Sequence, residues 1–198
     1  MRIAILGTGN VGTALGTGWT ASGHDVVFGS RDPGAATPPV GAVDSHAGAS
    51  STADIVVLAV PFDAVLAAVA AAGDLTGRIV VDASNPVGRP IPPPHRSGAE
   101  LVAAAAPGAK VVKAFNTMGF ETMAAAVVDG RPALALVAGD DPDAKAAVLG
   151  LARDLGFEAV DAGDLAAARL LENLAELWIH LAFRAGQGRA IAFSLLRR

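Results

Sequence analysis

Short runs of β-branched and other apolar residues alternate along the chain with stretches rich in Ala and Leu. Continuous apolar runs such as Arg2–Leu6 are typical of strands buried on both faces of a parallel sheet. Their alternation with helical stretches predicts an α/β fold with a mostly parallel sheet. The predicted strands are 2–6, 24–29, 54–60, 78–84, 110–115, 134–139 and 158–162, and the predicted helices are 10–22, 63–72, 98–106, 142–155 and 164–184.

The last predicted helix, 164–184, has Asp164 as its expected N-cap. Its apolar residues cover more of its surface than one core-facing stripe requires, so we expect it to close over the sheet or to form a contact between two copies. The apolar segment 191–196 follows it, without a pattern that fixes its form. The residues of the wide apolar surface are Leu170, Leu171, Leu174, Leu177, Trp178 and Leu181.

A glycine-rich turn separates the first predicted strand from the first predicted helix. Glycine at its first position permits a tight turn, glycine at the third lets a pyrophosphate approach the backbone, and glycine at the sixth lets helix and strand pack closely. The helix N-terminus then offers free N–H groups and a partial positive charge to phosphates. In this strand–turn–helix context, the pattern G-x-G-x-x-G predicts a dinucleotide site and a Rossmann-type, doubly wound sheet. The motif is Gly7-Thr8-Gly9-Asn10-Val11-Gly12.

The end of the second predicted strand indicates which dinucleotide binds. NAD-binding proteins usually carry Asp or Glu there, roughly 20 residues beyond the glycines, to bind the ribose 2′-hydroxyl. Here Ser30 and Arg31 occupy that place. A hydroxyl and a guanidinium can hydrogen-bond a 2′-phosphate that a carboxylate would repel, which favours NADP. Asp32 follows, and it could pair with Arg31 or face a 2′-hydroxyl.

Three further strand ends carry polar or turn-forming residues. In open α/β sheets the ligand lies beyond the carboxyl ends of the strands, so we expect these three segments to share one cleft with the glycine-rich turn. Asn and Ser also serve as turn formers and helix caps, and each segment alone could have only that role. The segments are Val60-Pro61-Phe62, Ser84-Asn85-Pro86 and Asn116-Thr117-Met118.

Side chains suited to acid–base or metal chemistry are few. The chain has no Tyr and no Cys, which excludes tyrosine-based proton donation, thiol catalysis and disulfides. His24 is expected to be structural, and His46 and His95 lie in predicted loops where they could be solvated. His180 shares a helix face with Glu172 and Glu176, an arrangement more typical of a solvated stripe than of a metal site. We therefore predict no catalytic side chain and no metal.

Composition and charge indicate which classes of binding partner the protein can have. Hydrophobic residues make up 52% of the chain and charged residues 17%, which is ample for a buried core. The net charge of −4 and the lack of a basic cluster argue against nucleic acid. No apolar stretch is long enough to span a membrane, and the glycines interrupt the N-terminal apolar run before it could serve as a signal peptide, so we expect a cytoplasmic protein.

The chain resembles the family of F420-dependent NADP oxidoreductases over nearly its whole length. The shared segments are 1–12 (MRIAILGTGNVG), 23–33 (GHDVVFGSRDP), 55–61, 84–86, 112–117 (VKAFNT) and 161–172 (DAGDLAAARLLE). The resemblance implies an NADP-binding Rossmann domain over residues 1–163, a C-terminal helical segment over 164–198 that closes the cleft, and a homodimer.

The resemblance also implies residue roles. Hydride would pass between the nicotinamide and the deazaflavin coenzyme F420, with no side-chain acid, because the two cofactors carry the chemistry. Thr8, Asn10 and Val11 would contact the pyrophosphate, and Ser30 and Arg31 the 2′-phosphate. Segments 84–86 and 116–118 would line the place where the rings meet.

Two other functions remain open at this point. Coenzyme F420 carries an acidic tail, and only Arg89, Arg96 and Lys113 are candidates to bind it. The pair Asn116-Thr117 is also shared with metalloreductase relatives. The protein could therefore be an NADPH-dependent reductase of a different small-molecule acceptor, namely a flavin, a ferric chelate, or a small imine or carbonyl compound. The missing catalytic acid is also compatible with a non-catalytic NADP(H)-binding redox sensor.

Overall fold

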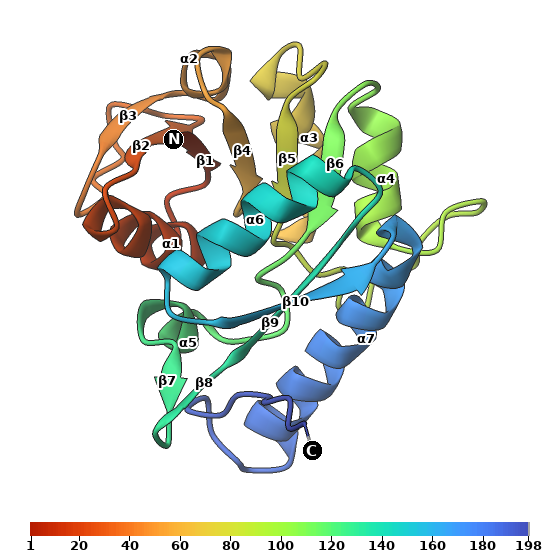
Figure 1. Ribbon diagram of the computed structural model, residues 1–198. Helices are drawn as coiled ribbons and strands as arrows, with labels where there is room; N and C mark the ends of the chain where they lie inside the picture. The colour runs from red at the N-terminus through yellow and green to blue at the C-terminus, as the bar shows by residue number, and fades with distance from the viewer. Residues whose placement is uncertain (198) are drawn as a thin grey trace.

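A computed structural model describes residues 1–197, and Arg198, the last residue of the predicted C-terminal segment, lies outside the described residues. Its centre is an eight-stranded sheet in the order β10-β9-β6-β5-β4-β1-β2-β3 (Figure 1). The strands are β1 Arg2–Leu6, β2 Asp25–Ser30, β3 Ala42–Ser45, β4 Ile55–Leu58, β5 Ile79–Asp82, β6 Lys110–Lys113, β9 Leu134–Gly139 and β10 Glu158–Gly163.

Six of these strands, from β3 to β6 across the sheet, run parallel to one another. Strand β9 joins antiparallel to β6, and β10 joins parallel to β9. The parallel part has the order of a dinucleotide-binding doubly wound sheet, with the reversal of strand order between β1 and β4. The predicted fold class, doubly wound with a mostly parallel sheet, is confirmed.

Helices cover both faces of the sheet because alternate strand residues point to opposite sides. On one face Ile3 and Ile5 pack with residues of α1 and α6, and on the other Ala4 and Leu6 pack with residues of α2, α3 and α4. The helices are α1 Asn10–Ala21, α2 His46–Ser51, α3 Phe62–Ala72, α4 Gly98–Ala105, α5 Phe120–Ala124, α6 Pro142–Asp154 and α7 Ala168–Ile179. A small hairpin, β7 Val127–Val128 and β8 Arg131–Pro132, lies beside α5 (Figure 1).

Strand β3 and helix α2 were not predicted from the sequence. Strand β3 is an edge strand with partly exposed side chains, and α2 consists mainly of Ala, Gly and Ser. Neither has the continuous apolar run or the helical periodicity that reveals a buried element. Pairing with β2 and packing of Ala49 and Ala53 into the core decide their form instead.

The C-terminal helix is built in three parts rather than as one α-helix. A 3-10 turn, Leu165–Ala167, leads into α7, and a π-helical turn, His180–Arg184, ends it. Asp164 occupies the N-cap position, as predicted, but its side chain makes no capping bond. Asp140 accepts the Leu165 N–H at 2.9 Å and satisfies that helical end from a neighbouring loop.

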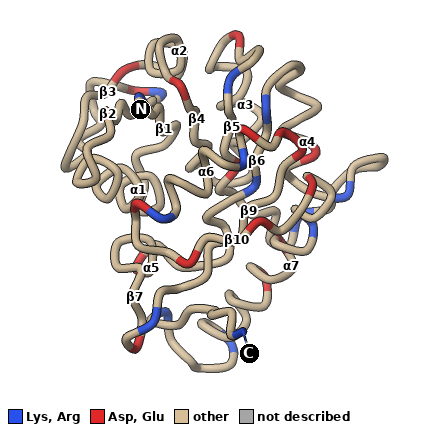
Figure 2. The backbone as a smooth tube through the Cα atoms, in the orientation of Figure 1, with Lys and Arg blue, Asp and Glu red and all other residues tan. Residues whose placement is uncertain are grey.

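The segment after α7 has no regular secondary structure and folds back on the domain. The Trp178 indole N–H donates to the Ile191 carbonyl at 2.9 Å, and Leu134 N–H donates to the Phe193 carbonyl at 2.9 Å. Trp178 is buried. Within residues 1–197, none of the helices combines the length and apolarity needed to span a bilayer. Lys and Arg are interspersed with Asp and Glu along the backbone (Figure 2).

Candidate functional site

The glycine-rich turn lies where the strand order reverses. Gly7 follows β1 and donates its N–H to the Gly29 carbonyl at 3.0 Å, while Ala59 N–H donates to the Leu6 carbonyl at 2.9 Å. The ends of β1, β2 and β4 are thus held together at one edge of the sheet. A ligand that lies beyond the carboxyl ends of the strands would meet this turn first.

The glycines of the turn are required by close backbone contacts. Gly7 has a φ of +120°, and a Cβ there would lie 2.4 Å from the Ala59 carbonyl oxygen. A Cβ on Gly12 would lie 2.2 Å from the Gly7 carbonyl oxygen. Gly9 faces open space, with nothing within 4 Å of its ideal Cβ. The tight positions therefore shape the turn, and the open position leaves room for a group to approach the backbone, as a pyrophosphate requires.

The N-terminus of α1 is open to an anion. No side chain caps it, and its first turn contains no acidic residue. Its free N–H groups therefore have no competing carboxylate. A cavity of about 240 Å³, here called the turn cavity, adjoins this end. Its lining residues are Gly7, Thr8, Gly9, Gly29, Ser30, Arg31, His46, Ala59, Val60 and Pro61.

Arg31 supplies the positive charge of the turn cavity. Among residues 1–197 it has no hydrogen-bond or ion-pair partner, so its guanidinium is available to a ligand. The Ser30 hydroxyl donates to the Asp32 carbonyl at 3.0 Å and accepts the Asp32 N–H at 3.1 Å. Asp32 itself is exposed, is not part of the cavity lining, and does not pair with Arg31. The carboxylate therefore leaves the cation free.

His46 is buried in the wall of the turn cavity, with 6% of its surface exposed, so the expectation that it is solvated is wrong. Burial and the neighbouring Arg31 hold the pKa of its imidazole below the ordinary 6.5, while the Gly29 backbone acts in the opposite direction. His46 is the first residue of α2, the element that the sequence did not reveal. No local pattern could have placed it here.

A larger cavity of about 430 Å³, here called the edge cavity, extends from the turn along the sheet edge. It shares Gly9, Ala59, Val60 and Pro61 with the turn cavity, so the two are adjacent. Many of the predicted site residues line it, and four others join them. The predicted ones are Gly9, Asn10, Val11, Val60, Pro61, Phe62, Ser84 and Asn85, and the others are Ala59, Ala83, Phe120 and Arg189.

The segment Asn116-Thr117-Met118 lies beneath this cavity rather than on its wall. All three residues are buried, at 3%, 4% and 7% exposure. The Asn116 side-chain amide donates to Asn85 Oδ1 at 2.9 Å, and the Asn85 amide donates to the Asn116 carbonyl at 2.8 Å. Asn116 thus holds Asn85 in the cavity wall through these two hydrogen bonds.

Arg189 comes from the segment after α7 and was not predicted. Its guanidinium carbon lies 4.7 Å from the Phe120 ring centre and 5.3 Å from that of Phe183. It also pairs with Glu121 at 2.6 Å, and this hydrogen bond holds the pKa of the Glu121 carboxyl below its usual 4.5. The surrounding sequence, Gly-Gln-Gly-Arg, has no periodicity that could have indicated a site.

A buried ion cluster lies behind the edge cavity. Lys113 is fully buried, and its ammonium group contacts Asp82 at 2.8 Å, Glu172 at 3.1 Å and the Ser84 carbonyl at 2.5 Å. Glu172 also accepts the N–H groups that open α4. Lys113 is therefore unavailable to an anionic acceptor, and the expectation that Glu172 is solvated is wrong. The cluster ties α7 to β5, β6 and α4.

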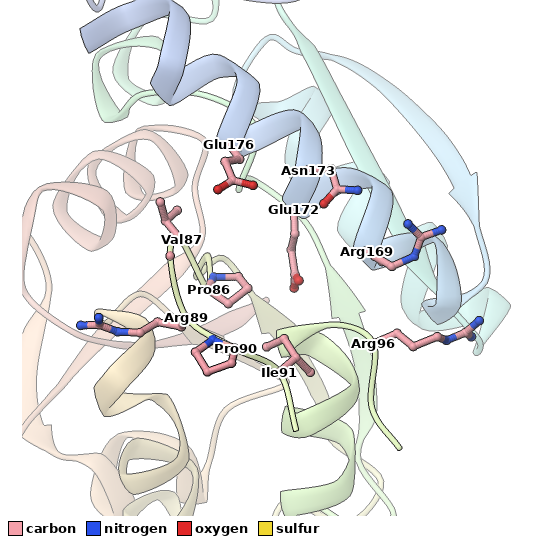
Figure 3. A pocket seen from close by; sticks show the side chains of 11 residues that line it. Pro86, Val87, Arg89, Pro90, Ile91, Arg96, Arg169, Glu172, Asn173 and Glu176 are labelled. Carbon is pink, nitrogen blue, oxygen red and sulfur yellow. The ribbon is translucent and has the colours of Figure 1, made fainter. Parts of the chain in front are cut away.

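A separate cavity of about 240 Å³, here called the loop cavity, lies between the Pro-rich loop and α7. Pro86, the last residue of the predicted segment Ser84-Asn85-Pro86, lines this cavity and not the edge cavity. Glu172 and Glu176 reach toward Pro86, whereas Arg89 and Arg96 extend outward (Figure 3). Arg89 pairs with Asp63 at 2.6 Å, and Arg96 lies 3.5 Å from Glu100.

The other histidines lie away from the three cavities described. His24 contacts Asp154 at 2.9 Å, which confirms a structural role. His180 is exposed on the π-helical turn, and His95 is half-buried in the Pro-rich loop. Within residues 1–197, a dinucleotide at this edge of the sheet would meet hydrogen-bond donors, the unpaired cation of Arg31 and apolar side chains.

Comparison with known proteins agrees with this geometry. The family described as NADP oxidoreductase, coenzyme F420-dependent, matches residues 2–86. The F420-dependent NADP reductase of Methanothermobacter thermautotrophicus is 30% identical over 210 residues, which cover 93% of this chain and 90% of the relative. A crystal structure from Arthrobacter sp. FB24, described as a candidate F420-dependent NADP reductase, superposes with a TM-score of 0.88 at 33% identity and covers both chains completely.

A second group of relatives is much longer. Metalloreductase STEAP3 of Rattus norvegicus is 34% identical over 176 residues, which cover 87% of this chain but 36% of the relative. This chain thus spans little more than a third of that protein.

Proposed function

This chain belongs to the family of coenzyme F420-dependent NADP oxidoreductases, and on that premise we propose that it transfers hydride between NADP(H) and coenzyme F420. The observation that carries the proposal is the adjacency of two cavities. The turn cavity holds an uncapped helix N-terminus and Arg31, which is unpaired among residues 1–197, and it shares Val60 and Pro61 of its wall with the edge cavity. Phosphates fit the first cavity, and the reacting rings fit the second.

We assign the dinucleotide as follows. The N–H groups of Thr8, Asn10 and Val11 bind the pyrophosphate, and Ser30 and Arg31 bind the 2′-phosphate. A further cavity of about 220 Å³, here called the helix cavity, lies between Arg31 and α3 and takes the adenine. Its wall on the α3 side is apolar, since it is lined by Ala64, Ala67, Ala68 and Ala71.

The residues of the edge cavity orient the rings and exclude water from them. When bound, the nicotinamide supplies or accepts the hydride. Phe62 and Phe120 offer apolar faces to the rings, and Asn85, held by Asn116, offers an amide for orientation. Transfer between two ring cofactors depends on this alignment rather than on a side-chain proton donor.

We also propose that residues 164–198 act as a closing segment and as the contact of a homodimer. Arg189 brings this segment to the wall of the edge cavity. Leu170, Leu177 and Phe183 are 56%, 48% and 57% exposed, which leaves an apolar surface on its outer side. A dimer predicts that light scattering gives twice the chain mass, and that Leu170→Glu with Leu177→Glu gives the mass of one chain.

The test combines binding with turnover. Wild-type protein is expected to bind NADPH more tightly than NADH in calorimetry, and Arg31→Ala is expected to weaken NADPH binding at least tenfold with little effect on NADH. Arg89→Ala, an exposed arginine paired with Asp63, is the matched control and should change neither. Equal binding of the two dinucleotides by the wild type would refute the assignment of the turn cavity.

Turnover is followed by mixing protein, NADPH and oxidised coenzyme F420 and recording the loss of the deazaflavin absorbance. Loss of absorbance at a rate proportional to protein supports the proposal. Tight NADPH binding with no turnover of any acceptor would favour a redox sensor over an enzyme.

One observation favours a different acceptor as the second candidate function. Lys113 is fully buried and Arg89 and Arg96 are paired with carboxylates, so Arg189 is the cation on the wall of the edge cavity, and it too contacts Glu121. An acceptor without an acidic tail, such as a free flavin, a ferric chelate or a small imine, would need no further cation. NADPH oxidation by one of these, and none with coenzyme F420, would establish this alternative.

A further inference from the structure

His46 has no role in the pyrophosphate and ring contacts assigned above. His46 lines both the turn cavity and the helix cavity. Arg31, which we assign to the 2′-phosphate, also lines both cavities. The side chain is more than nine-tenths buried, and its Nδ1 atom is enclosed without a hydrogen-bond partner. A buried, titratable side chain in the wall of two cavities, beside the cation of Arg31, is placed to respond to a bound anion.

The orientation of the ring follows from its neighbours. A Cβ on Gly29 would lie 3.0 Å from Nδ1, so this nitrogen faces the backbone at the end of β2. The Gly29 backbone favours the protonated ring. When the neutral ring carries its proton on Nδ1, it presents the lone pair of Nε2 on the other edge, and the protonated ring presents an N–H there.

From this arrangement we propose that His46 determines specificity for the 2′-phosphate of NADP(H), taking up one proton from solvent when that phosphate binds beside Arg31. The proposal rests on the NADP(H) site proposed above. The proton comes to the imidazole, no other bond forms or breaks, and the ring changes from a hydrogen-bond acceptor to a second cationic donor. NADH has a 2′-hydroxyl instead, and its binding leaves the ring neutral.

The charges around His46 favour a neutral ring before the ligand arrives. Burial and then Arg31 lower the pKa of the imidazole, so the free protein holds it uncharged near neutral pH. A doubly ionised phosphate between the two groups reverses the effect of Arg31, because an anion favours the charged ring. The proton uptake is thus a direct consequence of a phosphate at this position.

The other charged groups on the elements around α2 are engaged elsewhere. Helix α2 packs against β1, β2, β3 and α3. On β3 the Asp44 carboxylate lies against Gly48 and accepts the Ser45 N–H at 2.6 Å. The remaining charged residues on these elements are Arg2 and Asp25, which lie 3.6 Å apart at the far ends of β1 and β2, and Asp63 on α3, which pairs with Arg89.

The primary test measures protons as well as affinity. Calorimetric titrations at about pH 7 are run in two buffers with different ionisation enthalpies, once with NADPH and once with NADH. We expect the wild type to take up close to one more proton with NADPH than with NADH. His46→Gln, which keeps a polar side chain but cannot titrate, is expected to lose this difference. His24→Gln, a change at the histidine bound to Asp154, is the matched control and should retain it.

The pH dependence gives a second, independent readout. Above about pH 6.5, where the 2′-phosphate is doubly ionised, the preference of the wild type for NADPH over NADH should fall by up to tenfold per pH unit as pH rises. The His46→Gln variant should show a weaker and flat preference. An unchanged proton uptake or an unchanged pH slope in His46→Gln would overturn the proposal.

Two further results keep the inference separable from the proposed function. If the wild type does not prefer NADPH at all, the NADP(H) site itself is refuted. If His46→Gln fails to fold, nuclear magnetic resonance of the wild-type imidazole decides the matter. A rise in the pKa of His46 with NADPH and not with NADH supports the proposal, and no rise with either contradicts it.

Discussion

Replacing Lys113 with Met tests the buried ion cluster. The substitution keeps the length of the side chain and its apolar stem while removing the ammonium group. That group contacts Asp82 at 2.8 Å and Glu172 at 3.1 Å, and all three side chains are at least nine-tenths buried. Without Lys113 two carboxylates remain in the interior with no countercharge, and the Ser84 carbonyl loses its donor.

The expected loss is about 3 to 5 kcal/mol in the free energy of unfolding, because breaking a buried pair leaves an uncompensated charge. Typical domains are stable by about 5 to 15 kcal/mol, so the variant will be marginal at room temperature. Glu172 shares the ammonium group with Asp82, so the effects of Lys113→Met and Glu172→Gln should not add. The double variant should lose about 1 kcal/mol less than the sum of the single variants.

The assay is urea unfolding followed by far-ultraviolet circular dichroism. Lys110→Met is the matched control, since Lys110 lies on the same strand and pairs with Asp141 at 2.9 Å on the surface. Solvent screens that pair, so the control should lose far less stability. Equal losses in Lys113→Met and Lys110→Met would refute the view that the cluster holds α7 against the sheet.

Two other predictions concern the turn and the C-terminal segment. Gly7→Ala places a Cβ 2.4 Å from the Ala59 carbonyl oxygen at a φ of +120°. The free energy of unfolding should therefore fall by about 2 kcal/mol or more, and calorimetry should show no NADPH binding. Gly73→Ala, at a φ of +84° in open space, should show only the smaller backbone cost. Hydrogen bonding to Arg189 lowers the pKa of the Glu121 carboxyl, so the stabilisation from this pair is present above about pH 4.5 and is lost as pH falls through the lowered value. Wild type and Glu121→Gln should therefore differ in urea unfolding at neutral pH and converge in acid, and a difference that persists in acid would contradict this assignment.

The sequence by itself determined the parts of this protein that depend on local pattern. Apolar runs marked the buried strands, and β1 was predicted with its observed bounds, Arg2–Leu6. The glycine spacing indicated the turn, because a side chain at Gly7 or Gly12 would clash with backbone atoms nearby in the chain or at the end of the adjacent strand. Arg31 could be placed near the turn because the second strand of such a sheet runs parallel to the first.

The tertiary structure alone decided what depends on residues far apart in the chain. His46 reaches the turn cavity because β3 pairs with β2, and Arg189 reaches the edge cavity because the last segment folds back over α7. From the sequence, Lys113 is a candidate to bind an acidic tail and Glu172 is expected to be solvated, yet each is buried against the other. Neither hydropathy nor spacing records such pairing, since a charged residue can be buried when, and only when, its partner arrives from another element.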